Sequence, residues 1–264
     1  MPTVDGFKTG YFCWADAATS DHQAGRDFYV NLFGWEADDM PVPGGGTYTM
    51  FKVGGRNVAA ISAQQDEERA QGIPPHWNVY VSVDDVDSFT KEAEAAGGAV
   101  LMPPFDVLDS GRMAVIADPA GAVLGLWQPA AHRGYGLVSE PGAPDWHELL
   151  SADLDRARNF YRDLFRWEVE DSEMPNATYT LFRDGDTYVA GAMARPEDMG
   201  DMPSHWTVYF NVADCDAAAA RVKELGGQIY VEPMVIESVG KFAACADPQG
   251  AAFSILKPET GTSS

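Results

Sequence analysis

The sequence predicts an α+β protein made of two similar domains, each a cupped and mostly antiparallel sheet with its helices on the outside. Two observations lead to this prediction. Blocks of sequence recur in the same order about 130 residues apart, which indicates a tandem duplication. Within each copy, strand patterns follow one another and outnumber helix patterns, which favours curved antiparallel sheets over a doubly wound parallel sheet.

Four pairs of matching blocks carry the repeat. They are DFYVNLFGWE at 27–36 with NFYRDLFRWE at 159–168, TYTMFKV at 47–53 with TYTLFRD at 178–184, HWNVY at 76–80 with HWTVY at 205–209, and GRMAVIADPAG at 111–121 with GKFAACADPQG at 240–250. These blocks predict one domain over 8–129 and a second over 143–258. The stretch 130–142 is rich in Gly, Pro and Ala and predicts a linker, and 259–264 predict a flexible tail.

Each copy contains two units that begin with a strand and a helix. In the first unit we expect a strand over 11–15, then a helix that Ser20 or Asp21 caps and Gly34 ends. The remaining elements of the first copy are strands near 47–53, 57–63 and 76–83, a helix over 86–96 that ends at Gly97-Gly98, and strands near 112–117 and 122–128. One further strand per unit is left open by this pattern.

Composition excludes several classes of function. The chain has 18 Lys and Arg against 40 Asp and Glu, a net charge of −22, which repels nucleic acid. No apolar run approaches the ~20 residues of a membrane span, and the first residues do not resemble a secretory signal. Cys13, Cys215 and Cys245 are scattered and odd in number, so we expect free thiols and a cytoplasmic protein.

The blocks resemble the glyoxalase/bleomycin-resistance superfamily, also called the vicinal oxygen chelate superfamily. The residues that carry the resemblance are the helix ends at Phe28–Trp35 and Phe160–Trp167, the steps VDDVD at 83–87 and VADCD at 212–216, and the two Asp-Pro-x-Gly turns. The resemblance implies that each domain holds two βαβββ units around a pocket. The two-domain layout and PVPGGG at 41–46 resemble an actinobacterial subgroup labelled glyoxalase-like or "hydroxylase", which includes a mycobacterial antigen and proteins of aromatic polyketide biosynthesis.

The resemblance also implies three metal-ligand positions per domain, normally His or Gln, His, and Glu. A divalent ion needs about three protein donors and open positions for substrate oxygens. Counting from the motifs assigns these positions to Trp14, Asn78 and Gly125 in the first domain and to Trp146, Thr207 and Ser254 in the second. None of these is an ordinary ligand. A displaced site could use His76 with Asp16, or His205 with Glu148, but we find no third donor and expect neither a metal nor another cofactor.

Strand alternation predicts an aromatic-lined cup with a few polar groups instead. The candidate ligand-binding residues are Trp14, Asp16, His76, Asn78, Tyr80, Arg112 and Trp127 in the first domain, and Trp146, Glu148, His205, Thr207, Tyr209 and Ser254 in the second. An inward-facing acid must be paired, solvated or shifted in pKa, and Arg112, Lys241 and the histidines are the candidate partners. Simpler interpretations stay open: aromatic core, scaffold histidines and structural acids.

Our first hypothesis is a metal-independent protein that binds an aromatic or hydrophobic small molecule of natural-product or antibiotic type. The alternative is a metal-free lyase, isomerase or hydrolase in which Glu148 or Asp16 acts as a base with His205 or His76. Metal-dependent glyoxalase or dioxygenase chemistry and a purely structural role also stay open. A small molecule is the expected partner and a biosynthetic enzyme a second candidate, with no nucleic acid or membrane, for a monomer or homodimer. The second domain has the more polar cup.

Overall fold

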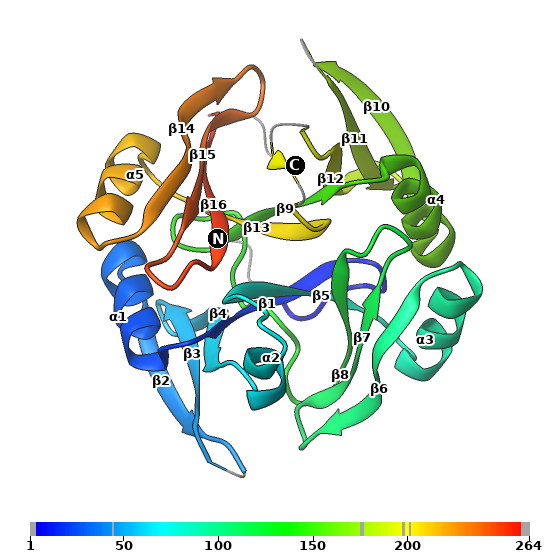
Figure 1. The fold of residues 1–264 in the computed structure, drawn as a ribbon, viewed down its shortest axis with the longest axis horizontal. Coiled ribbons are helices and arrows are strands. Elements are labelled where there is room, and N and C mark those ends of the chain that lie inside the picture. Colours follow the sequence, from blue (N-terminus) through cyan, green and yellow to red (C-terminus); the bar gives the residue numbers. More distant parts are fainter. Residues whose placement is uncertain (1–3, 44, 175–176, 197–198, 201, 260–264) are drawn as a thin grey trace.

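The computed structural model describes residues 4–43, 45–174, 177–196, 199–200 and 202–259 (Figure 1). The first sheet contains β1 (Phe12–Thr19), β2 (Glu36–Pro41), β3 (Thr47–Val53), β4 (Arg56–Ala63), β5 (His76–Ser82), β6 (Ala99–Val107), β7 (Gly111–Ala117) and β8 (Val123–Pro129). The second contains β9 (Pro144–Ser151), β10 (Glu168–Met174), β11 (Ala177–Asp184), β12 (Thr187–Ala194), β13 (His205–Asn211), β14 (Gln228–Ile236), β15 (Gly240–Ala246) and β16 (Ala252–Pro258). The helices are α1 (His22–Phe33), α2 (Asp66–Ala70), α3 (Val86–Ala95), α4 (Leu154–Phe165) and α5 (Cys215–Glu224).

Both sheets have the same strand order. In the first it is β2-β3-β4-β1-β5-β8-β7-β6, and in the second β10-β11-β12-β9-β13-β16-β15-β14. The two central strands of each sheet pair antiparallel, whereas each of them pairs parallel to the last strand of its own unit. Each domain is therefore two βαβββ units joined side by side, and the predicted fold is confirmed.

The strands that the sequence left open, β2 and β6, lie at the two edges of the first sheet. β2 reads EADDMP and is largely exposed, and β6 contains the pair Pro103-Pro104. Charged residues and proline are typical of edge strands because one side of the backbone needs no ladder partner. Neither strand therefore shows a clear alternation of apolar and polar residues.

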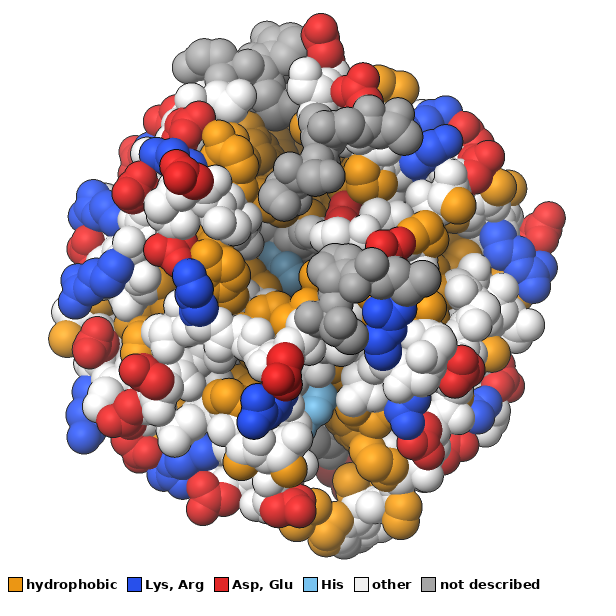
Figure 2. Space-filling model, turned by 180° about the vertical axis from the view of Figure 1, so that it is seen from behind, with side chains coloured by type: hydrophobic (Ala, Val, Ile, Leu, Met, Phe, Trp, Pro, Cys, Tyr) orange, Lys and Arg blue, Asp and Glu red, His pale blue; other side chains and the backbone are white. Residues whose placement is uncertain are grey.

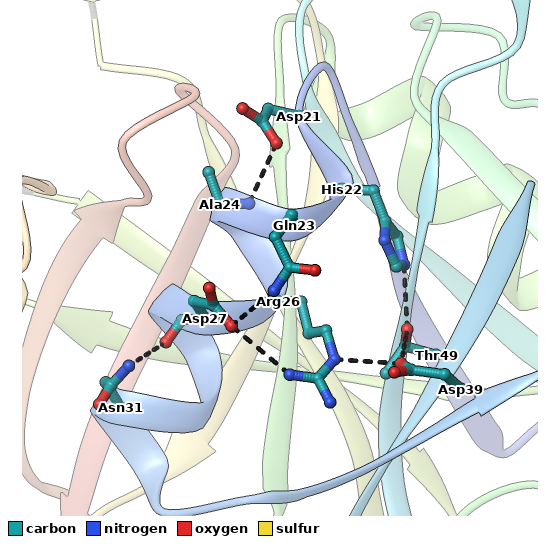
Figure 3. A network of polar contacts seen from close by, with 9 residues as sticks. All are labelled: Asp21, His22, Gln23, Ala24, Arg26, Asp27, Asn31, Asp39 and Thr49. Carbon is teal, nitrogen blue, oxygen red and sulfur yellow. Dashed lines mark hydrogen bonds and ion pairs between the residues drawn. The ribbon is translucent and has the colours of Figure 1, made fainter.

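The N-terminus of α1 is tied to the neighbouring strands by a polar network (Figure 3). Asp21 caps the helix through the backbone N–H of Ala24. Asp39 accepts hydrogen bonds from the Arg26 guanidinium at 3.0 Å and from the Thr49 hydroxyl at 2.6 Å, and His22 Nε2 lies 2.9 Å from that hydroxyl. The second domain repeats the Arg–Asp–Thr part with Arg158, Asp171 and Thr180. These contacts fix the helix to β2 and β3 of its own unit.

The two domains pack through the aromatic residues of the repeated helix motif. In Figure 1, α1 lies beside α5 and α3 beside α4. Tyr29 donates a hydrogen bond to Asp247 of the other domain at 3.0 Å and accepts one from Trp77 at 2.9 Å, and its ring centroid lies 5.7 Å from that of Phe253. Trp206 donates in the same way to Tyr161 at 2.8 Å. The motif that identifies the repeat therefore builds the interdomain core.

The segment between the domains is packed rather than loose. Tyr135 and Leu137 are buried, and the backbone N–H groups of Tyr135 and Gly136 donate to the carbonyls of Cys13 and Asn57 at 2.8 Å each. Of the segments singled out in the sequence, Gly44 in 41–46 and residues 260–264 of the tail lie outside the described residues. Within the described residues, no helix has the length and apolar character needed to cross a membrane.

Candidate functional site

The pairing of the two central strands places the predicted residues on one face of each sheet. In the first domain Trp14 lies opposite Tyr80, Asp16 opposite Asn78, and Ala18 opposite His76. In the second, Trp146 lies opposite Tyr209, Glu148 opposite Thr207, and Leu150 opposite His205. Side chains of alternate residues share a face. We call the face with Trp14, Asp16, Asn78 and Tyr80 cup 1, and the face with Trp146, Glu148, Thr207 and Tyr209 cup 2.

Asp16 is the centre of a hydrogen-bonded cluster in cup 1. Its carboxylate accepts hydrogen bonds from Tyr48 at 3.0 Å, from Asn78 at 3.0 Å and from Tyr80 at 3.2 Å. Trp14 Nε1 in turn donates to the Tyr48 hydroxyl at 3.0 Å. Burial raises the pKa of Asp16, and these hydrogen bonds offset only part of the increase.

Glu148 occupies the matching place in cup 2. Its carboxylate accepts hydrogen bonds from Tyr179 at 2.7 Å and from Tyr209 at 2.8 Å, and Trp146 Nε1 donates to the Tyr179 hydroxyl at 3.0 Å. Burial raises the pKa of Glu148 more than the two phenols lower it, and the same burial raises the pKa of both phenols well above their ordinary range. Ser254 contacts the Tyr209 hydroxyl. Each cup thus holds an acid between two tyrosines, next to a tryptophan.

Tyr48 and Tyr179 were missed from the sequence as site residues. Both lie in the repeated Thr-Tyr-Thr block, which gives the available signal. Their strands, β3 and β11, are separated from the acid-bearing strands by one intervening strand, so the contact depends on a register that sequence patterns do not supply.

The predicted cationic partners of the two acids are wrong for Arg112 and Lys241. Arg112 forms ion pairs with Asp87 and Asp106, and Lys241 pairs with Asp216 on α5. On β7, Arg112 is followed by Met113, which lies opposite Trp127 on the face of cup 1. Successive side chains of a strand point to opposite faces, so the Arg112 side chain points away from cup 1. Arg112 therefore does not line cup 1.

The histidines at the starts of β5 and β13 have a scaffold contact. Nδ1 of His76 lies 2.9 Å from the Pro74 carbonyl, and Nδ1 of His205 lies 2.8 Å from the Pro203 carbonyl. His147 lies on the interdomain side of β9, as alternation predicts. Its ring stacks on Phe12 with centroids 4.1 Å apart, and burial lowers its pKa to about 3. His147 is therefore neutral.

The residues present do not fit a divalent metal at the positions that the resemblance implies. A Cβ on Gly125 would lie 2.2 Å from the ring of Tyr80, so that ring fills the space of a longer side chain at this position. The described parts of the chain contain no group of three or more His, Cys, Asp or Glu placed to hold a metal ion. The acid of each cup accepts hydrogen bonds from two phenols, whereas a divalent ion is usually held by about three His, Asp, Glu or Cys donors.

The two cups differ in how far they are closed. Trp14, Asp16 and Tyr80 are each less than 10% exposed, and the ring of His132 from the interdomain segment lies 4.4 Å from that of Trp14. Burial lowers the pKa of His132 to about 4. In cup 2 Tyr209 is as buried as Tyr80, whereas Trp146 and Glu148 are only partly buried. Figure 2 shows one face of the molecule, with acidic side chains spread over it and a hollow near its centre in which a histidine side chain is visible.

Comparison with known proteins decides the family. The model of the Glyoxalase/Bleomycin resistance protein/Dioxygenase superfamily matches residues 12–126 and 143–255. The chain belongs to this superfamily. Each domain matches separately, so the superfamily identity and the tandem arrangement rest on the same observation. The resemblance drawn from the motifs is confirmed.

Relatives within the superfamily are of equal length and come from actinobacteria. The chain is 45% identical to "Putative glyoxylase CFP32" of Mycobacterium tuberculosis, over 98% of each chain. It is 38% identical to "Anthracycline biosynthesis protein DnrV" of Streptomyces peucetius, over 97% of this chain and 96% of the relative.

Solved structures of the superfamily share the fold. The Mn(II)-bound glyoxalase of Novosphingobium aromaticivorans has a TM-score of 0.67 at 16% identity, covering 95% of this chain and 82% of that one. The 2,3-dioxygenase LapB of Pseudomonas sp. KL28 has a TM-score of 0.65 at 13% identity, covering 96% and 95%. At such low identity the likeness shows the architecture alone.

Proposed function

We propose that this protein binds an aromatic or hydrophobic small molecule of natural-product type in cup 2, without a metal ion. The observation that carries the proposal is the group of Trp146, Glu148, Tyr179 and Tyr209, in which one carboxyl group is held by two phenols beside an indole, and all but the buried Tyr209 are partly exposed. A largely apolar site with a few fixed polar groups is the usual form of a small-molecule site. The relatives named for anthracycline biosynthesis support this class of ligand.

The chemistry of cup 2 suits a ligand with a planar ring and a hydroxyl or carbonyl group at its edge. Trp146 and Tyr209 offer apolar ring surface, which stabilises a flat ligand through buried area and stacking. Glu148 offers a polar contact whose orientation Tyr179 and Tyr209 fix. Cup 1 has the same elements, but the buried Trp14 and the ring of His132 leave them less accessible.

A metal-free lyase or isomerase is the second candidate, favoured by the raised pKa of Glu148. A base with a raised pKa is better matched to proton transfer near neutral pH. Glu148 would act with Tyr179 and Tyr209 rather than with His205. Both of its carboxylate oxygens accept hydrogen bonds from these phenols, whereas Nδ1 of His205 contacts a backbone carbonyl.

We also propose a cellular location, an oligomeric state and a partner for the protein. The described cysteines are free and buried, which suits a reducing cytoplasm. The two domains already pair within one chain, which supports a monomer over a homodimer. Besides the small molecule, we propose as partner a biosynthetic enzyme that supplies or receives the ligand.

The experiment is a titration of planar natural products, anthracyclines included, followed by calorimetry and tryptophan fluorescence. We expect one saturable site, and Glu148→Gln should weaken binding about tenfold, which is ~1.4 kcal/mol. The matched change Asp16→Asn in cup 1 should leave affinity within about twofold. Absence of saturable binding across the panel would refute the binding function, and stoichiometric Mn, Fe, Ni or Zn in the purified protein would refute metal independence. Conversion of a bound ligand to a product that Glu148→Gln abolishes would favour the lyase or isomerase.

A further inference from the structure

A cavity of about 160 Å³ lies where the N-terminal segment, the interdomain segment and the starts of β9 and β12 meet. Its walls come from three segments: the N-terminal Tyr11, the interdomain Tyr135 and Ser139, and the starts of β9 and β12 with Asp145 and Tyr188. We call this space the junction cavity. His147 also lines it, whereas Glu148, the next residue of β9, points into cup 2. The junction cavity thus shares Trp146 with cup 2, but Glu148, Thr207 and Tyr209 do not line it.

The charge of the junction cavity is one-sided. Asp145 lines it, and none of the residues in its wall is Lys or Arg. His147 is neutral, because burial lowers its pKa to about 3. Ser139 and Asn211 hydrogen-bond to the Asp145 carboxyl group and offset only part of the pKa increase that burial causes. A partly buried carboxylate of this kind is stabilised by an opposite charge from outside the wall.

Tyrosine rings complete the wall. Tyr11, Tyr135 and Tyr188 all contribute to it, and the Tyr11 and Tyr188 hydroxyls are held by Asp184 at 2.9 Å and Glu170 at 3.4 Å. The faces of tyrosine rings attract cations, and a hydrogen bond that the hydroxyl donates to a carboxylate increases the electron density of the ring. The Lys8 ammonium lies 6.0 Å from the centre of the Tyr11 ring, so this ring already has a cation near it.

The backbone at the cavity is held in an unusual conformation. Ser139, which contacts Asp145, has a φ of 56°, a left-handed value that residues other than glycine rarely adopt. Its N–H donates to the Pro144 carbonyl at 2.8 Å, which holds the turn in place. Strained residues of this kind concentrate at binding and switch sites.

We propose that the junction cavity binds a compact organic cation, an alkylammonium or quaternary ammonium group, between Asp145 and the rings of Tyr11, Tyr135 and Tyr188. Aromatic walls attract such cations through the faces of their rings, and a carboxylate adds the opposite charge. A volume of about 160 Å³ limits the ligand to roughly the size of a benzene ring, which fits engineered cavities of ~150 Å³. The net charge of −22 raises the local concentration of cations.

The test is calorimetric titration of the full chain with choline and with its neutral isostere 3,3-dimethylbutan-1-ol. We expect choline to bind one site and the neutral compound to bind at least tenfold more weakly. Asp145→Asn should weaken choline at least tenfold, whereas Glu94→Gln, the same charge change on the exposed side of α3, should have less than a twofold effect. Tyr188→Ala changes a side chain that is 39% exposed and should weaken choline threefold or more without unfolding the protein.

Glu148→Gln separates this site from the proposed function, since it changes cup 2 alone. We expect Glu148→Gln to leave the affinity for choline unchanged, whether or not it weakens the binding of natural products in cup 2. Loss of choline binding in Glu148→Gln with retention in Asp145→Asn would place the cation in cup 2 and overturn the proposal. Equal binding of choline and the neutral isostere, or no choline binding at all, would overturn it as well.

Discussion

The hydroxyl of Tyr29 links the two domains, and removing it gives a direct test of how the repeat motif works. Tyr29→Phe keeps the ring, which is fully buried, and deletes only the oxygen. That oxygen donates to Asp247 at 3.0 Å and accepts from Trp77 at 2.9 Å. The matched variant is Tyr161→Phe in the other domain, whose hydroxyl accepts from Trp206 at 2.8 Å.

The two variants should differ in stability because the Tyr29 hydroxyl makes a close hydrogen bond to Asp247, whereas the Tyr161 hydroxyl interacts more weakly with Asp118. A hydrogen bond to a charged group contributes about 1.5–3 kcal/mol, and a buried donor left without its acceptor costs about 1–3 kcal/mol. Tyr29→Phe loses the first and orphans Trp77, so we expect a loss of about 3 kcal/mol. In the other domain the Tyr161 hydroxyl also interacts with Asp118, but more weakly, since Oδ2 of Asp118 is buried without a close hydrogen-bond partner among the described residues. Tyr161→Phe should therefore cost about 1–1.5 kcal/mol, mainly for the Trp206 bond.

Urea unfolding at neutral pH, followed by tryptophan fluorescence, measures this difference. With a slope of about 3 kcal/mol/M, Tyr29→Phe should lower the midpoint by about 1 M and Tyr161→Phe by about a third to a half of that. Asp247→Asn combined with Tyr29→Phe should cost less than the sum of the two single changes, since the partners contact each other. Equal midpoint shifts for the two tyrosine variants, or additive costs in the double variant, would refute the reasoning.

Three further predictions concern the cups. Gly125→Ala should lower stability by about 2 kcal/mol in thermal or urea unfolding, because the added Cβ would lie 2.2 Å from the ring of Tyr80. Tyr179→Phe removes a hydrogen bond that lowers the pKa of Glu148, so NMR titration of that carboxyl group should show a still higher pKa and calorimetry a several-fold weaker ligand. Burial raises the pKa of Asp16 and of Glu148, so the stability linked to each acid is fully present below its unfolded pKa and is lost as pH rises through its folded pKa. Urea midpoints should therefore fall with rising pH over that window, and less steeply in Glu148→Gln.

The fold could be predicted because the duplication supplies an internal comparison. Two copies of each strand and helix pattern reinforce one another, and the helix caps at Asp21 and Asp153 are visible as single residues before apolar runs. The edge strands β2 and β6 could not be predicted, since an exposed edge imposes no alternation on its side chains. α2 is only five residues long and has no buried side chain, so it leaves no apolar period.

The face of each cup could also be predicted, but not the partners of its residues. Period-two alternation along β1 correctly placed Trp14 and Asp16 on one side and His147, along β9, on the other side from Glu148. Which groups reach the acids depends on how neighbouring strands align. Tyr48 reaches Asp16 across β4, and this alignment is set by packing rather than by local sequence. Long cationic side chains were the wrong expectation because phenols satisfy a buried carboxyl group without placing a second charge out of water.

The same comparison explains why the two cups need not do the same work. In each cup a glycine leaves room for one tyrosine ring, but the two glycines lie on different strands of the repeat. Gly125 on β8 accommodates Tyr80 in cup 1, and Gly191 on β12 accommodates Tyr179 in cup 2. Ala60 stands beside Asp16 where Gly191 stands beside Glu148. Aromatic rings therefore fill different parts of the two cups. A side chain long enough to bind a metal from β8 would collide with Tyr80 in cup 1. In cup 2 the matching position is the buried Ser254, and the described residues include no group of three metal donors around Glu148. One scaffold thus carries two cups whose interiors differ, and of the two it is cup 2 whose acid and indole are partly exposed.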